Sequence, residues 1–254
     1  MGGGSTAAEV KGHKLSNDQL AALAGDSTDA TVVRDTLTTW IEVVAVTDDA
    51  SGMTTPKELS ARKQAALKNL LVRFGDAGRA TYQLGLKGSP LLCLAAIPLD
   101  KTVTGATVLE ELAGGTTFAE AAKKYSADKT LAESGGLVKS ADGVECIAGD
   151  QFNPALIKAL EDAKVAVGEP AAVSLKDQEV LVLLRPYDEL TLSDGERLKL
   201  SANDIGAVLN ESYRAAKIEV AERIGTWDPE LARVVATGNP AGTSPGGMLP
   251  VTTG

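Results

Sequence analysis

The sequence predicts an α+β fold in which a mixed segment interrupts a helical part. Three observations support this fold class. The first third of the chain shows successive helix signals, each with a polar cap at its start and Gly or Pro at its end. At Ser89-Pro90 the pattern changes, and short apolar runs typical of strands appear between helices. Helical periodicity returns after Pro186, so we expect the two ends of the chain to pack together.

The first third is mainly helical by its caps and apolar spacing. Ser16 or Asn17 can accept hydrogen bonds from the free N–H groups that start a helix, and Gly25 can end that helix. Thr55 caps a later helix, in which Pro56 takes the first helical position. The expected elements are a strand and turn at 7–15 and helices at 18–25, 31–46, 56–74 and 76–86.

The middle third contains the clearest local signal in the chain. Thr117 and Glu120 form a capping box, and Phe118, Ala122 and Tyr125 then lie on one helical face. The other expected elements are a buried strand at 91–97, helices at 107–112 and from Asn153-Pro154, a hairpin of 171–175 and 178–184, a helix at 201–217 and an extended segment at 217–220.

The composition of the chain limits the kinds of ligand that the protein can bind. The 254 residues carry a formal net charge of -9, with 44% hydrophobic, 23% charged and 4% aromatic residues. Phosphate binding needs a basic face, and single-stranded nucleic acid needs aromatic stacking platforms. The sequence therefore predicts a globular protein with no nucleic-acid partner.

The ends of the chain differ in composition from the rest. Residues 1–5 resemble a flexible linker, and no apolar run approaches the length that spans a bilayer. We expect any membrane attachment to depend on an N-terminal segment removed from this sequence. Residues 237–254 are rich in Gly, Pro, Thr and Ser, as in a tail. The predicted domains are a linker at 1–5, an N-terminal helical part at 6–88, a mixed domain at 89–190, a C-terminal helical part at 191–236 and a tail at 237–254.

The two cysteines, Cys93 and Cys146, cannot form a metal site by themselves. They are compatible with two buried thiols or with one disulfide, and the residues alone leave both alternatives open. His13 is the only histidine and lies in a turn-like segment. The sequence predicts no metal and no cofactor.

The mixed segment resembles a parvulin-type peptidyl-prolyl isomerase domain. The matching pieces are the strand CLAAIPL, the helix FAEAAKKYS, the Gly135-Gly136 pair, QFNPAL before the third helix and the closing strand VLVLL. The resemblance implies a small antiparallel sheet with surrounding helices.

The flanks resemble those of SurA-type and foldase-lipoprotein chaperones, in which a helical N-terminal part is interrupted by the parvulin domain. The ending KIEVAERIGTWDPELARVV resembles that of actinobacterial members. This resemblance implies an extracytoplasmic protein that binds unfolded or proline-containing polypeptides. It also favours a disulfide between Cys93 and Cys146, because extracytoplasmic compartments are oxidising.

The family's active-site pattern is changed in this sequence. Family members have a histidine in the first strand, where Ala96 stands, and another in the last strand, where Glu179 stands at the matching point. A Cys or Asp follows the second helix, and Asp128 matches it as a candidate catalytic residue. The apolar proline pocket is represented by Phe152 and Leu156. The resemblance therefore implies a degenerate site with substrate-binding residues Ala96, Glu179, Phe152 and Leu156.

Loss of both histidines has a physical consequence for catalysis. Amide rotation has a barrier of about 18–20 kcal/mol, which an isomerase lowers by stabilising the twisted imide. Ala96 has no hydrogen-bonding side chain, and a carboxylate at 179 would add charge. We expect a chaperone with weak or lost prolyl isomerase activity. An active isomerase with an altered site and an assembly subunit with one fixed partner are the alternatives.

Overall fold

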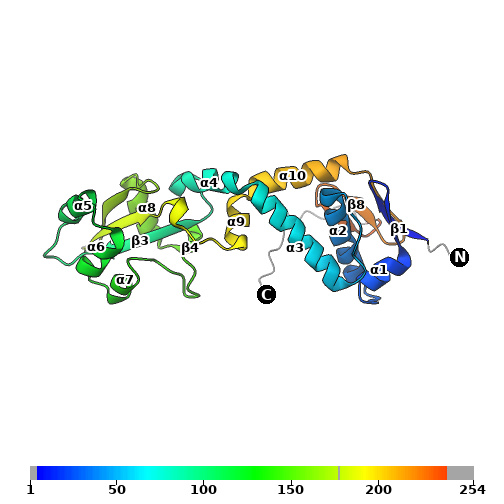
Figure 1. Cartoon of the computed structure of the whole chain (residues 1–254), viewed down its shortest axis with the longest axis horizontal. Coiled ribbons are helices and arrows are strands. Elements are labelled where there is room, and N and C mark those ends of the chain that lie inside the picture. The colour runs from blue at the N-terminus through cyan, green and yellow to red at the C-terminus, as the bar shows by residue number, and fades with distance from the viewer. Residues whose placement is uncertain (1–4, 177, 239–254) are drawn as a thin grey trace. The chain divides into compact units, whose positions relative to one another are not determined.

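The chain forms two compact units, each built from the residues that the structure describes. A computed structural model describes residues 5–176 and 178–238 (Figure 1). Among the described residues, one unit comprises 5–73 and 203–238, and the other comprises 74–176 and 178–202. Most of the linker and tail predicted at 1–5 and 237–254 lies outside the described residues. The predicted α+β class is confirmed: both units combine helices with small antiparallel sheets.

The first unit contains four helices and two small sheets among its described residues. Ser16 and Gln19 form a capping box at the start of its first helix, as the polar residues before that helix predicted. The elements are β1 (Thr6–Val10), β2 (His13–Ser16), α1 (Asn17–Leu23), α2 (Ala30–Thr47), α3 (Pro56–Arg73), α10 (Ala202–Ala215), β7 (Ile218–Val220), β8 (Thr226–Asp228) and β9 (Arg233–Val235).

The two ends of the chain meet in this unit. β7 pairs with β1 in a sheet of order β2-β1-β7, with Ala8 opposite Val220. The hairpin of β8 and β9 packs on α2, where the Val234 N–H donates to Thr38 Oγ1 over 2.9 Å. Trp40 on α2 is 1% exposed and lies in the core. Segments from the two ends of the chain therefore pack together in this unit.

The second unit is a four-stranded antiparallel sheet with helices around it. This is the arrangement that the parvulin resemblance implied, and it is inserted between the two parts of the first unit. The elements are α4 (Gly75–Gln83), β3 (Leu92–Pro98), α5 (Gly105–Ala113), α6 (Phe118–Tyr125), α7 (Lys129–Glu133), β4 (Cys146–Ile147), α8 (Pro154–Asp162), β5 (Pro170–Leu175), β6 (Gln178–Leu184) and α9 (Asp194–Leu200), with short 3-10 turns at Gly85–Lys87, Gly149–Gln151 and Tyr187–Glu189.

The sheet has the order β4-β3-β6-β5 and two apolar faces. Because successive residues of a strand point to opposite faces, each strand contributes to both. One face packs with Phe152 and Leu160 around α8, and we call it the α8 face. The other packs with Val108 of α5 and Ala122 of α6, and we call it the α5/α6 face. The central strands β3 and β6 are buried on both faces, which explains their continuous apolar sequences.

The boundary of the second unit differs from the one that Ser89-Pro90 suggested. The unit begins at Phe74, and α4 and α9 belong to it because they pack on each other. A Cβ on Gly78 of α4 would lie 2.7 Å from Ser201 Oγ, so only glycine allows this close crossing. The same Ser201 hydroxyl donates to the Phe74 carbonyl over 3.2 Å. This contact joins residues far apart in sequence, and local pattern does not reveal it.

Candidate functional site

The α8 face brings together three of the residues that the sequence proposes as a binding site. Phe152 belongs to the core cluster of this face, and Ala96 and Leu156 pack against the same cluster. Phe152 is 9% exposed, so its ring is part of the core. Ala96 and Leu156 are half-buried at the edge of the cluster. Any ligand on this face would therefore meet the edge of the cluster and only a small part of Phe152.

Local sequence explains why Phe152 and α8 stand where they do. Asn153 accepts the Ala155 N–H through Oδ1 over 2.9 Å, and Pro154 takes the first helical position, as the Asn-Pro signal predicted. Upstream, Cys146 is paired with Cys93 in register and forms a disulfide with it. This covalent link to β3 holds the segment that leads to Phe152 against the sheet.

The strand residues on the α8 face are apolar from edge to edge. Ala96 stands opposite Val182, and Val182 stands opposite Ala171 on the far strand. The Ala96 N–H donates to the Gly136 carbonyl over 2.7 Å. Gly136 has a φ of +86°, and a Cβ there would lie 3.0 Å from the Phe118 ring, so the glycine pair permits a close backbone approach. By register, the neighbour of Ala96 on the closing strand is Val182, which the sequence reasoning did not single out.

Glu179 does not join this group. It alternates with Val180 and therefore points to the α5/α6 face, whereas Ala96 belongs to the α8 face. Its Oε2 accepts the Gly105 N–H over 2.7 Å at the start of α5. A carboxylate is stabilised at a helix N-terminus by the exposed N–H groups and the helix dipole. Glu179 is thus an N-terminal partner of α5 and lies on the face of the sheet opposite to Ala96.

Asp128 is the N-cap of α7. Its Oδ1 accepts the N–H groups of Thr130 and Leu131 over 2.8 and 3.1 Å. The side chain is exposed, and its hydrogen bonds with Thr130 and Leu131 are those of an N-cap. A cap accounts for an acidic residue at this position without any catalytic role.

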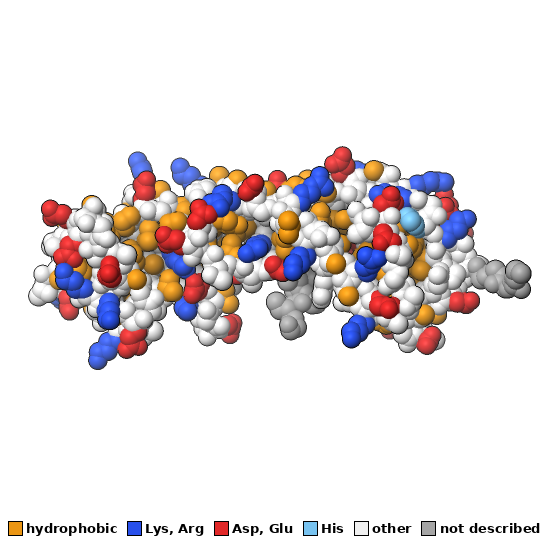
Figure 2. Space-filling view, viewed as in Figure 1, with side chains coloured by type: hydrophobic (Ala, Val, Ile, Leu, Met, Phe, Trp, Pro, Cys, Tyr) orange, Lys and Arg blue, Asp and Glu red, His pale blue; other side chains and the backbone are white. Residues whose placement is uncertain are grey.

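The edge of the α8 face is formed mainly by apolar side chains. Figure 2 shows apolar side chains gathered around α8 and the sheet of the second unit. The half-buried members that pack on this cluster include Val138, Leu156, Ile157 and Leu175. Such a surface can contact an apolar side chain. The strand residues Ala96, Val182 and Ala171 on this face carry no acid, base or hydrogen-bonding side chain.

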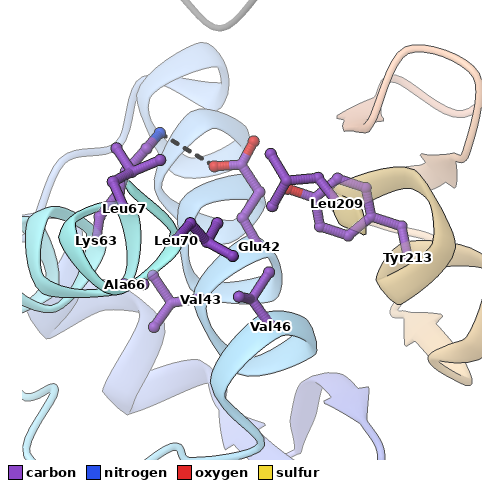
Figure 3. A pocket seen from close by; sticks show the side chains of 9 residues that line it. All are labelled: Glu42, Val43, Val46, Lys63, Ala66, Leu67, Leu70, Leu209 and Tyr213. Atoms are coloured by element: carbon purple, nitrogen blue, oxygen red, sulfur yellow. Dashed lines mark ion pairs between the residues drawn. The ribbon is translucent and has the colours of Figure 1, made fainter. Parts of the chain in front are cut away.

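A second apolar depression lies within the first unit, between α2, α3 and α10 (Figure 3). We call it the hollow; its volume is about 310 Å³, including solvent at its mouth. It is lined by Glu42, Val43, Val46, Lys63, Ala66, Leu67, Leu70, Leu209 and Tyr213. Sequence reasoning missed it, although the apolar positions of all three helices are visible in the sequence.

The polar groups of the hollow are a carboxylate, an ammonium and a phenol. Glu42 Oε2 and Lys63 Nζ form an ion pair of 3.0 Å, with the Glu42 side chain 12% exposed. Burial raises the pKa of Glu42, and the charge of Lys63 opposes that shift. Burial, and then the charge of Glu42, raise the pKa of Tyr213. The Tyr213 and Trp227 rings form a T-shaped pair with 5.7 Å between ring centroids. The hollow is therefore an apolar site with one partly desolvated ion pair.

Two further searches of the described residues concern metals and membranes. Within 5–176 and 178–238, no group of three or more His, Cys, Asp or Glu side chains could hold a metal ion. No helix in that part of the chain is long and apolar enough to cross a bilayer.

Comparison with known proteins gives distant structural similarity only. No protein-family model matches the chain, and no curated protein matches it. A crystal structure of PrsA from Bacillus subtilis is 16% identical, with a TM-score of 0.32, and the match covers 84% of this chain and 93% of that one. A foldase protein PrsA from Streptococcus pneumoniae is 15% identical, with a TM-score of 0.31 and the same coverage. A peptidylprolyl isomerase PrsA from Bacillus anthracis is 13% identical, with a TM-score of 0.32, covering 77% of this chain and 93% of that one.

Proposed function

We propose that this protein is an extracytoplasmic chaperone of the foldase kind that binds unfolded or extended polypeptide and has weak or no prolyl isomerase activity. The observation that carries the proposal is the apolar row Ala171, Val182 and Ala96 across three strands of the α8 face. Ala96 stands where the resembled family has one of its histidines. Ala96 and Ala171 are half-buried and Val182 is buried, so an apolar side chain can contact the row at its two half-buried members.

Binding and catalysis make different demands on such a surface. An extended segment needs apolar contact and a few backbone hydrogen bonds. Isomerisation also needs groups that interact more strongly with the twisted imide than with the planar one. Glu179 is engaged with Gly105 on the opposite face of the sheet, and Asp128 is engaged as a helix cap. The candidate residues therefore support binding and not catalysis.

The disulfide supports the extracytoplasmic location within this proposal. Cys93 and Cys146 are both buried, at 0% and 5% exposure, and their bond is expected to persist in an oxidising compartment.

The test measures two activities on one preparation of the full chain. We expect equimolar protein to suppress aggregation of a reduced, unfolded client while changing its proline-limited refolding rate by less than about twofold, well below the gain from general acid–base groups. Strong acceleration would support the altered-site isomerase instead. Protection of no unfolded client would support the subunit with one fixed partner.

Paired variants locate the binding surface. Leu156→Glu places a charge at the edge of the α8 face and should weaken client binding about tenfold, which corresponds to about 1.4 kcal/mol. Leu84→Glu is the matched control, because Leu84 is already 57% exposed in the same unit. Equal loss in both variants, or in neither, would exclude the α8 face as the binding surface.

A further inference from the structure

The strand β5 forms one edge of the sheet in the second unit. It pairs with β6 on its inner side, and no other strand of the described residues pairs with it. Helices pack on both of its faces: Val173 belongs to the cluster around α8, and Ala172 packs against the cluster of α5 and α6. Ala172 is half-buried and Ser174 is exposed. The two faces of β5 are therefore covered, while its outer side has no strand beside it.

The hydrogen bonds of β6 show which backbone groups of β5 point outward. In an antiparallel sheet, the N–H and C=O of one residue point to one neighbouring strand, and those of the next residue point to the opposite side. The Glu179 carbonyl accepts the Leu99 N–H over 2.9 Å, so the backbone of Glu179 faces β3. Val180 therefore faces β5, where it stands opposite Val173. Val173 then bonds inward, and the residues before and after it direct their backbone groups away from the sheet.

These two outward-facing residues are Ala172 and Ser174. No hydrogen bond joins their N–H or C=O groups to any residue of 5–176 or 178–238. Each presents one donor and one acceptor, and the two positions are about 7 Å apart along the strand. Donors and acceptors at this spacing match the backbone of another extended chain. The edge of β5 is therefore complementary to a polypeptide strand.

β5 lacks the features that usually protect an edge strand from pairing. Charged side chains and short length are two such features. The six residues of β5 carry no charge, and Pro170 occupies the first position of the strand, where proline does not interrupt the ladder. The other edge strands of the described residues differ: β4 has two residues, and β2, β7, β8 and β9 each contain a charged residue, which is Lys14, Glu219, Asp228 or Arg233.

The length and position of this edge favour a segment of an unfolded polypeptide over a second copy of the chain. Stable protein–protein interfaces use about 20–30 residues on each side. β5 offers six residues, which suits weak and reversible binding. The edge is also continuous with the α8 face, because Ala171 of β5 ends the apolar row that includes Val182. A strand added beside β5 would place every second side chain next to the half-buried Ala171 and Leu175.

We propose that an extended segment of an unfolded client pairs antiparallel with β5 and becomes a fifth strand of this sheet. Its backbone bonds to Ala172 and Ser174, and alternate side chains contact the edge of the α8 face. Because main-chain groups make the bonds, the edge accepts many sequences and prefers uncharged, apolar residues at alternate positions. This inference rests on the proposed chaperone function and adds the conformation in which the client is bound.

N-methylated peptides test the pairing on the unmodified full chain. The probe is a terminally blocked, fluorescent peptide of about eight alternating threonine and valine residues with a neutral glycol tail. In an antiparallel pair, opposite residues share a face, so client residues that bond to Ala172 and Ser174 point to the α5/α6 face. With valine on the α8 face, methylation of the threonine nitrogens should weaken binding about tenfold, whereas methylation of the valine nitrogens should change it little. No binding of the parent peptide at millimolar concentration, equal effects of both methylations, or a loss with valine alone would overturn the proposal.

Amide hydrogen exchange locates the added strand. Measured by NMR, the exchange of the Ala172 and Ser174 amides should slow about tenfold when the peptide is added at saturating concentration. The Val173 amide already bonds to β6 and is the internal control, so its exchange should change much less. Unchanged exchange at both outward positions would contradict pairing at β5. Protection that appears without peptide and rises with protein concentration would assign the edge to a second copy of the chain instead.

Matched substitutions at Ser174 separate the edge from the chaperone function. Ser174→Pro removes one outward N–H and should weaken peptide binding about tenfold, whereas Ser174→Ala keeps the N–H and should bind as the parent does. If circular dichroism shows Ser174→Pro to be unfolded, Ser174→Lys replaces it, because a charge on an edge discourages pairing. Equal peptide binding by the folded edge variant and by Ser174→Ala would refute the edge, and client protection by the parent chain would then still support the chaperone proposal. Peptide pairing without any client protection would refute the chaperone proposal alone.

Discussion

Glu179 Oε2 accepts the Gly105 N–H over 2.7 Å, and this bond joins the closing strand of the sheet to the first turn of α5. The position is tightly packed. A Cβ on Gly105 would lie 2.6 Å from the Ala172 Cβ and 2.7 Å from Glu179 Oε1. Glu179 and Gly105 therefore form a structural pair, and this pair explains the carboxylate at the place where sequence comparison suggested a site residue.

Replacement of Gly105 tests this packing. Gly105→Ala should destabilise the second unit by about 1–3 kcal/mol, because the added methyl group has no room. Urea unfolding followed by circular dichroism measures the change. Gly195→Ala in α9 is the control: its nearest contact is 3.9 Å away, and removal of a helical glycine there should stabilise by about 0.4–1 kcal/mol. Equal effects at both positions would show that the close approach at Gly105 is absent.

Substitution of Asp128 separates a cap from a catalytic group. Asp128→Ala should cost about 0.5–2 kcal/mol of stability through loss of the N-cap, while Asp128→Asn keeps the acceptor and should cost much less. Both variants should bind an unfolded client as well as the parent does. A proline-limited refolding rate that falls in Asp128→Asn, with stability unchanged, would instead assign the carboxylate to catalysis.

The disulfide gives a chemical prediction. Alkylation of the denatured, unreduced protein should find no free thiol, because Cys93 and Cys146 are bonded to each other. The sequence separation of 53 gives about 4 kcal/mol of stabilisation on the chain-entropy model. Unfolding of the Cys93→Ala, Cys146→Ala double variant measures that contribution. Two alkylated thiols in the unreduced sample would refute the bond directly.

The raised pKa of Glu42 predicts how its contribution to the stability of the protein changes with pH. Burial raises its pKa above 4.5, so the folded state holds this proton more tightly than the unfolded state does. The group's contribution to stability is present at low pH and is lost as the pH rises through the raised pKa. Glutamine has no such loss, so the stability of Glu42→Gln relative to the parent should increase as the pH rises from 4.5.

Glu58 on α3 provides a control of opposite sign in the same unit. Hydrogen bonds from Thr54 lower its pKa below 4.5, so its contribution is lost as the pH falls. The stability of Glu58→Gln relative to the parent should therefore decrease as the pH rises toward neutrality. Parallel slopes for Glu42→Gln and Glu58→Gln in urea unfolding would contradict the assigned burial of Glu42.

The sequence by itself determined the secondary structure of most of the chain. The capping box of Thr117 and Glu120, the Asn153-Pro154 helix start and the hairpin around Lys176 all stand where local signals predicted. These features depend on hydrogen bonds and backbone preferences within a few residues. The apolar strand around Cys93 could likewise be predicted, because a strand buried on both faces has a continuous apolar sequence.

Only the tertiary structure decided which residues share a surface. Successive residues of a strand point to opposite faces of the sheet. Glu179 and Val182 are three positions apart, so they lie on opposite faces. The register with Ala96 selects Val182, and register depends on pairing between distant strands. The hollow at Glu42 and Tyr213 likewise needs three helices from both ends of the chain. Contacts of this kind arise from long-range packing, which local sequence patterns do not encode.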